Sequence, residues 1–220
     1  MLNLEPSRTG LVIVDMQNDF MHPDGAYRRN EQNCAAISAL PGRLVSVANA
    51  IRHTGGWIIS THFTLVPDKE EKPFISSHLK NLRPFLGKGD FAPGSFGQAL
   101  IEDLQPADLA VEKISFSAFY QTRLEWILRK AGLETLIFAG IVTNGGVAST
   151  VRDAHVRDFQ NIVLSDGCAA FNDDVHDATI KSLSTISQII TCEKIIKEND
   201  NVACKKKNKE TEKIESKGNY

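Results

Sequence analysis

The stretch ETLIFAGIVTNGGVASTVRD, from Glu134 to Asp153, joins an apolar run to a glycine-rich turn and a helix-like pattern. The apolar run consists of Leu136, Ile137 and Phe138, and Gly140 ends it. Beyond the turn, small and apolar residues recur at helical spacing: Val147, Thr150, Val151 and Ala154. This order predicts a buried strand, a tight turn and a helix. Ligand sites of open α/β sheets form at such turns, where backbone amides bind anions or polarised carbonyl groups.

Further apolar runs predict strands along the rest of the chain, at residues 10–15, 57–61, 109–113, 161–165 and 188–191. Helical patterns lie between them, at residues 41–53, 117–131 and 175–185. Continuous apolar runs are typical of parallel strands that are covered on both faces. The alternation therefore predicts an α/β fold of three layers, doubly wound, with a mainly parallel six-stranded sheet and helices on both faces. The long polar segment 65–95 is expected to help cover a site.

Composition narrows the class of protein. The chain has 220 residues and a formal net charge of −2, which fits one domain and argues against nucleic-acid binding. No apolar run approaches the roughly 20 residues that span a bilayer, so no membrane partner is expected. The four cysteines are scattered, as in a reduced chain, and no signal peptide is visible. We therefore expect a cytoplasmic protein, with secretion by a non-classical route left open.

The C-terminal part of the chain differs in character from the rest. It contains six lysines between positions 205 and 217 and almost no apolar residue after Val202. We expect one folded domain over residues 1–195 and a polar, Lys-rich, disordered tail over residues 196–220. A recognition tail is the alternative.

Polar side chains follow directly on several predicted strands. Asp15, His62 and Lys113 each stand at a strand end, as does the turn after Gly140. Parallel strands end at one edge of the sheet, so these residues are expected to converge there. A buried carboxylate needs a partner, and Lys113 is the candidate. A purely structural ion pair is the alternative, but its place at the ligand-binding edge favours a functional pair.

The chain resembles the isochorismatase-like (cysteine hydrolase) superfamily, which includes isochorismatases, nicotinamidases, N-carbamoylsarcosine amidases and ureidoacrylate or biuret amidohydrolases. The matching motifs are VDMQNDF (14–20), EKISFSAFYQTRLEWILRKAG (112–132), FAGIVTNGGVASTVRDA (138–154) and DGCAAF (166–171). The resemblance implies a Rossmann-type hydrolase domain that acts on a small-molecule substrate. It also implies a homodimer or homotetramer.

Site residues follow from the same resemblance. Asp15 matches the catalytic aspartate of the family and Lys113 the lysine that pairs with it. The Ile141–Val142 peptide matches a cis bond, and the amides of Gly145 and Gly146 would form the oxyanion hole. Further residues are expected to line the site: Gln17, Phe20, Phe119, Val142 and Asn144.

The mechanism turns on Gly146, because the amidase branches carry their nucleophilic cysteine at that position. Isochorismatases resemble this chain there, since they carry Gly. They hydrolyse a vinyl ether, a reaction that needs an acid and no protein nucleophile. The primary expectation is therefore hydrolysis of isochorismate, or a related small anionic metabolite, to pyruvate and a dihydroxy-cyclohexadiene carboxylate, with Asp15 as general acid.

Two alternatives stay open. The Thr143–Asn144 pair resembles the amidase pattern, which favours an amidohydrolase acting on a small amide or ureido compound without a cysteine nucleophile. The other alternative is a catalytically inactive member with a binding role. Nicotinamidases carry zinc ligands after their second strand, and only His62 of this chain lies near a matching position. The other histidines lack ligand spacing, so no metal site and no cofactor are expected.

Overall fold

The protein has a six-stranded sheet in which every strand is parallel to its neighbours, in the order β3-β2-β1-β4-β5-β6. The computed structural model describes the backbone of residues 4–217 and the side chains of residues 4–204. The strands are β1 (Thr9–Val14), β2 (Trp57–Phe63), β3 (Leu109–Lys113), β4 (Thr135–Ile141), β5 (Gln160–Ala169) and β6 (Gln188–Ile190). The predicted doubly wound α/β fold is confirmed.

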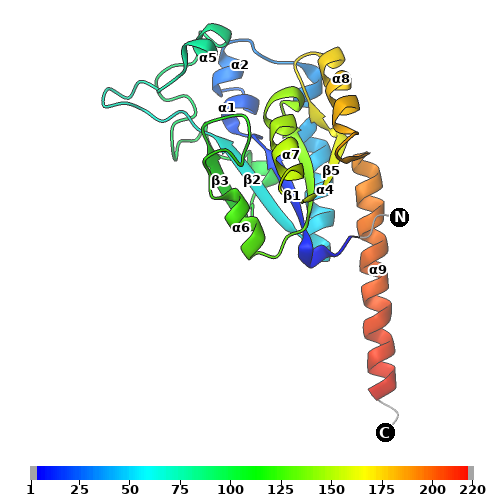
Figure 1. Ribbon diagram of the computed structural model, residues 1–220. Coiled ribbons are helices and arrows are strands. Elements are labelled where there is room, and N and C mark those ends of the chain that lie inside the picture. Colours follow the sequence, from blue (N-terminus) through cyan, green and yellow to red (C-terminus); the bar gives the residue numbers. More distant parts are fainter. Residues whose placement is uncertain (1–3, 218–220) are drawn as a thin grey trace.

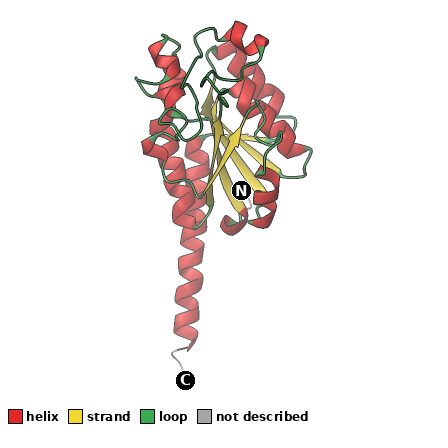
Figure 2. Cartoon of the chain, turned by 90° about the vertical axis from the view of Figure 1, so that its left-hand side faces the viewer, coloured by secondary structure: helices red, strands yellow, loops and turns green. Residues whose placement is uncertain are grey.

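Helices cover both faces of the sheet, which makes three layers (Figures 1 and 2). One face is covered by α4 (Leu40–Thr54) and the start of α9 (Cys192–Lys217). The other face is covered by α6 (Leu124–Lys130), α7 (Ala148–His155) and α8 (Asp173–Leu183). The shorter helices are η1 (Pro6–Arg8), α1 (Asn18–Met21), α2 (Ala26–Arg29), α3 (Ala35–Ser38), α5 (Ser77–Leu82), η2 (Glu102–Leu104) and the π-helical turn η3 (Thr143–Val147).

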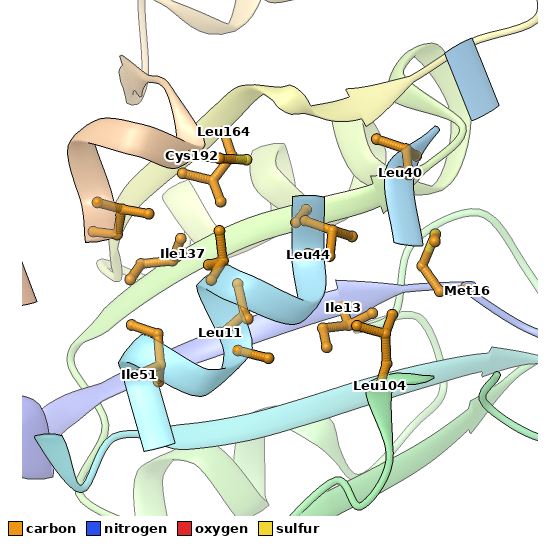
Figure 3. Close-up of a cluster of buried hydrophobic side chains, with 14 of the residues drawn as sticks. Leu11, Ile13, Met16, Leu40, Leu44, Ile51, Leu104, Ile137, Leu164 and Cys192 are labelled. Carbon is orange, nitrogen blue, oxygen red and sulfur yellow. The ribbon is translucent and has the colours of Figure 1, made fainter. Parts of the chain in front are cut away.

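The apolar run of β1 fills the core on both sides of the sheet because successive side chains point to opposite faces. Leu11 and Ile13 join the cluster under α4, whereas Val12 and Val14 join the cluster under α6 and α7. Figure 3 shows Leu44 on α4 directed toward β1 and β4. Full burial of each such side chain stabilises the folded protein by about 1.5–3 kcal/mol. A strand of apolar residues alone is therefore most stable at the centre of the sheet, where both of its faces are covered.

The end of β4 lies against β1 at Gly140. A side chain there would place its Cβ atom 2.1 Å from the Val14 carbonyl oxygen, and Gly140 has a φ of 114°. Only glycine fits this contact. The β4–β5 register shifts between Phe138 and Gly140, and pairing resumes at Gly140 with Cys168. For this reason β5 continues past the predicted end, and Asp166 lies inside the strand instead of after it.

Segments far apart in the sequence gather at the carboxyl edge of the sheet. Residues 16–33, which follow β1, contain α1 and α2, and α5 lies near them at the top of Figure 1. They share an apolar cluster of Ala26, Tyr27, Leu65, Leu86 and Phe91, with Phe20, Phe63, Ile75 and Phe85 packed against it. The segment 65–95 therefore packs on residues 16–33, beside the strand ends.

The structure continues α9 to Lys217, through most of the segment for which we expect a disordered tail, and α9 projects from the domain (Figure 1). Its first turns pack on α4: Ile195 is buried, and the Thr54 hydroxyl donates to Asn199 Oδ1 (3.0 Å). Beyond them the sequence is rich in Lys and Glu, which are good helix formers. Residues 218–220 of the predicted tail lie outside the described residues. Over the described part of the chain, no helix has the length and apolarity to span a membrane.

Candidate active site

Asp15 stands immediately after β1, in a sharp turn of the chain. Its φ is 54°, a left-handed conformation that Asp adopts more readily than most residues. Its amide donates to the Thr61 carbonyl oxygen (3.1 Å), and its own carbonyl accepts from the Gln17 amide (2.8 Å). The backbone on both sides therefore fixes where the carboxylate points.

The structure brings Asp15 and Lys113 together, as their positions at strand ends predict. Lys113 Nζ lies 2.6 Å from Asp15 Oδ2, and the Thr61 hydroxyl donates to Asp15 Oδ1 (2.9 Å). Lys113 also donates to the Ser115 carbonyl oxygen (3.0 Å), and its Nζ is 5.6 Å from the Phe63 ring centroid. Only 1% of the Lys113 side chain and 7% of the Asp15 side chain are exposed.

Opposing effects act on the pKa of Asp15. Burial disfavours the charged carboxylate and raises this pKa above its ordinary value. The charge and hydrogen bond of Lys113 and the hydrogen bond from Thr61 lower it, but burial is the larger effect. A carboxyl group with a raised pKa is suited to accept and release a proton during a reaction.

The glycine-rich turn lies against this carboxyl group. A Cβ atom on Gly146 would be 3.0 Å from Asp15 Oδ2, so the turn and the acid are in contact. The Ile141–Val142 peptide bond is cis. The Gly145 amide already donates to the Val142 carbonyl oxygen (3.0 Å), which makes it a poor candidate for the expected oxyanion hole. The Thr143 hydroxyl and His176 Nδ1 are 2.8 Å apart, which ties the turn to α8.

Gln17 was expected to line the site, but it braces the backbone instead. Its Nε2 donates to the carbonyl oxygens of Phe63 and Gln98 (both 2.9 Å), and its Oε1 accepts from the Phe63 amide (2.7 Å). The side chain is fully buried. Because these partners use its donors and its acceptor, Gln17 holds the ends of β1 and β2 together.

Phe119 was also expected at the site, and the structure places it elsewhere. Its ring packs near Phe159 (centroids 6.1 Å apart) and under Arg157 (4.9 Å), beside the beginning of β5. That is the opposite edge of the sheet from Asp15. Phe116 is the aromatic residue near the turn, because its Cε1 would lie 4.0 Å from a Cβ atom on Gly145.

The remaining expected residues surround the turn or its neighbourhood. Val142 is half-buried and Asn144 is exposed. Phe20 packs on Tyr27 and Phe91, with centroid distances of 4.7 and 4.6 Å, in the aromatic cluster beside the strand ends.

Thr61 and Phe63 touch the Asp15–Lys113 pair, although the sequence reasoning did not single them out. Both belong to β2, and Thr61 is the register partner of Val14, the residue before Asp15. Pairing of β1 with β2 could therefore have predicted the Thr61 contact.

His62 makes no metal site with its neighbours. Its Nε2 lies 2.9 Å from Ser60 Oγ, and burial lowers its pKa. Among the described side chains, no group of three or more His, Cys, Asp or Glu residues is placed to hold a metal ion.

A family model described as an isochorismatase domain matches residues 9–194. The chain belongs to the isochorismatase family. Ureidoacrylate amidohydrolase RutB of Methylobacterium radiotolerans is 31% identical over 196 residues, which cover 83% of this chain and 75% of that protein. RutB of Rhizobium rhizogenes is 29% identical over 193 residues, covering 81% and 78%.

Solved structures of isochorismatase-like proteins share the fold. A cysteine hydrolase from Pseudomonas syringae pv. phaseolicola superposes with a TM-score of 0.78 at 24% identity, covering 92% of this chain and 97% of that one. Nicotinamidase/pyrazinamidase PncA from Bacillus subtilis gives a TM-score of 0.66 at 23% identity, covering 83% and 98%. These structures share the fold, while the family match and the similarity to ureidoacrylate amidohydrolases identify the protein as an isochorismatase-like hydrolase.

Proposed function

We propose that this isochorismatase-like hydrolase cleaves a C–N bond in a small amide or ureido compound. The observation that carries the proposal is the buried Asp15–Lys113 pair in contact with the Gly146 turn. The ureidoacrylate amidohydrolases to which the chain is similar support this bond type. They favour the amidohydrolase alternative over the vinyl-ether hydrolysis of isochorismate that was the primary expectation.

A C–N hydrolase without the family's cysteine needs another nucleophile, and we assign this role to a water molecule held by Asp15 beside Gly146. A Cβ atom on Gly146 would lie 3.0 Å from Asp15 Oδ2 and 3.1 Å from the Ile141 carbonyl oxygen. A side chain on Gly146 would therefore point at the Asp15 carboxyl group, and the glycine keeps that approach clear of side-chain atoms. A water molecule in van der Waals contact with the Gly146 Cα atom could then donate a proton to Asp15 and direct a lone pair toward the substrate.

Asp15 would act first as general base and then as general acid. As the water oxygen bonds to the substrate carbonyl carbon, the carboxylate takes the water proton. The proton then passes to the leaving nitrogen as its bond to carbon breaks. One water is consumed, and an amine or ammonia leaves. Lys113 would hold the carboxylate in place and stabilise its charge while it is ionised.

The direct test measures product release by the purified protein. We expect ammonia from ureidoacrylate or related ureido and amide compounds, and no pyruvate from isochorismate. Gly146→Ala should lower kcat by about 100-fold or more, because its methyl group would lie 3.0 Å from Asp15 Oδ2 and block the approach of water to the carboxyl group. Gly42→Ala is the matched control, since a Cβ atom there meets nothing within 4 Å.

Each other outcome would change the conclusion. Pyruvate from isochorismate, without ammonia from the amides, would support ether hydrolysis with Asp15 as acid. No product from either isochorismate or the amide and ureido compounds would favour a catalytically inactive protein with a binding role. Full activity in Gly146→Ala would remove the water mechanism.

A further inference from the structure

Arg83 carries a half-buried guanidinium group near the carboxyl edge of the sheet, directly after α5. Its Nε donates to the Tyr27 hydroxyl (3.1 Å), and its Nη1 donates to the Leu82 carbonyl oxygen (2.8 Å). Its Cζ lies 5.9 Å from the Tyr27 ring centroid and 5.8 Å from the Phe171 ring centroid. Two aromatic rings from distant parts of the chain therefore hold this cation in place.

No acidic side chain among the described residues forms an ion pair with Arg83. Other arginines of the domain do have such partners: Arg29 pairs with Asp90, and Arg157 pairs with Glu125 and Asp153. Nη2 of Arg83 makes no hydrogen bond within the described part of the chain. A guanidinium group carries five N–H donors in a planar fork that matches a carboxylate. The group is thus oriented by its neighbours, and part of its fork is available.

The two rings connect Arg83 to the proposed site. Tyr27 packs on Phe20, which follows the β1 end closely, and its ring lies 5.9 Å from that of Phe171 at an angle of 11°. Phe171 follows β5, whose last residue, Ala169, pairs with Ile141 beside the turn. Burial is the main cause of the raised pKa of Tyr27, and the Asp15 carboxylate adds to it.

We propose that Arg83 binds a carboxylate of the substrate, at the end remote from the bond that is cleaved. The preferred substrates are then ureido or amide compounds that carry a carboxylate, not neutral amides. Asp15 and Lys113 form a closed pair with no net charge, so Arg83 supplies the cation that the substrate needs. This inference rests on the proposed C–N hydrolysis for its substrate class.

The experiment separates binding from turnover. Calorimetric titration compares 3-ureidopropionate with its methyl ester, on wild-type protein and on Arg83→Gln, Arg83→Lys and Arg129→Gln. Arg129 is the matched control, because its guanidinium also lies over an aromatic ring, that of Phe159 (4.4 Å), but at the other edge of the sheet. Ammonia release from both compounds is measured in parallel.

Wild-type protein should bind the acid more tightly than the ester, and Arg83→Gln should lose about 10- to 100-fold of this preference. Arg83→Lys, which keeps the charge but not the planar fork, should retain part of it, and Arg129→Gln all of it. An equal preference in wild type and Arg83→Gln, or binding of neither compound by wild type, would overturn the inference. Arg83-dependent binding without ammonia would instead reject only the proposed hydrolysis.

Discussion

Two clusters of acidic and basic side chains lie at opposite edges of the sheet and differ in burial. At the carboxyl edge, Asp15 and Lys113 expose 7% and 1% of their side chains. At the other edge, beyond the end of α7, Arg157 contacts Glu125 (2.9 Å) and Asp153 (3.1 Å), with exposures of 28%, 44% and 35%. Similar charges are therefore paired in two different dielectric environments.

The difference in burial determines how much each cluster can stabilise the folded protein. Exposed pairs contribute about 0–1 kcal/mol and are screened by salt. Burial of a charged pair costs several kcal/mol per ion in desolvation, so apolar residues of similar volume are often equally stable. Stability alone does not account for Asp15 and Lys113. Their contact with the Gly146 turn at the strand ends fits the catalytic role that we propose for the pair.

The largest expected effect comes from breaking the buried pair on one side. Lys113→Met leaves the Asp15 carboxylate buried without its partner and should lower the free energy of unfolding by about 3–5 kcal/mol. Turnover should also be lost. Urea unfolding and ammonia release measure the two effects.

The double variant Asp15→Asn/Lys113→Met distinguishes the roles. It removes both charges, so it should regain most of the stability and remain inactive. Lys197→Met, which removes an exposed lysine that pairs with Glu193, is the control for loss of a charge. An active double variant would show that the pair is structural.

The raised pKa of Asp15 predicts opposite pH trends for stability and turnover. The folded protein holds this proton more tightly than the unfolded chain, whose carboxyl group has a pKa near its ordinary value of 3.8. The contribution of this group to stability is then present below pH 3.8 and is lost as pH rises through the folded-state pKa. Turnover should rise over the same interval, because the general base must be ionised.

Thermal unfolding and initial rates, both recorded against pH, test this coupling. Asp15→Asn should remove the corresponding fall in Tm with rising pH. Turnover that falls as pH rises through this interval would instead indicate that Asp15 acts as an acid, as ether hydrolysis requires.

Much of the fold could be predicted because its strands are buried on both faces. Each of the predicted strands at residues 10–15, 57–61 and 109–113 lies within two residues of an observed strand. The prediction failed where tertiary contacts override the local pattern. β5 continues through the polar residues Asp166 and Gly167 because the shifted register lets Cys168 and Ala169 pair with β4.

The site was predictable where residues follow strands and was missed where they do not. Asp15 and Lys113 end apolar runs, and a parallel sheet brings such ends together. Phe116 precedes the predicted helix at residues 117–131 and Phe119 belongs to it, but the observed α6 begins only at Leu124, so helical spacing does not place either ring. The bracing role of Gln17 depends on backbone groups of Phe63 and Gln98, which are distant in the sequence.

The smallest effect is expected at the exposed edge. Arg157→Gln removes the contacts with Glu125 and Asp153, and it should lower the free energy of unfolding by about 1 kcal/mol or less, because water solvates the separated groups. Salt should shrink the difference further, and turnover should not change, since α7 lies between this edge and the Gly146 turn. Urea unfolding at low and high salt measures it, with ammonia release alongside. If Arg157→Gln lowered the free energy of unfolding as much as Lys113→Met, burial would not distinguish the two clusters.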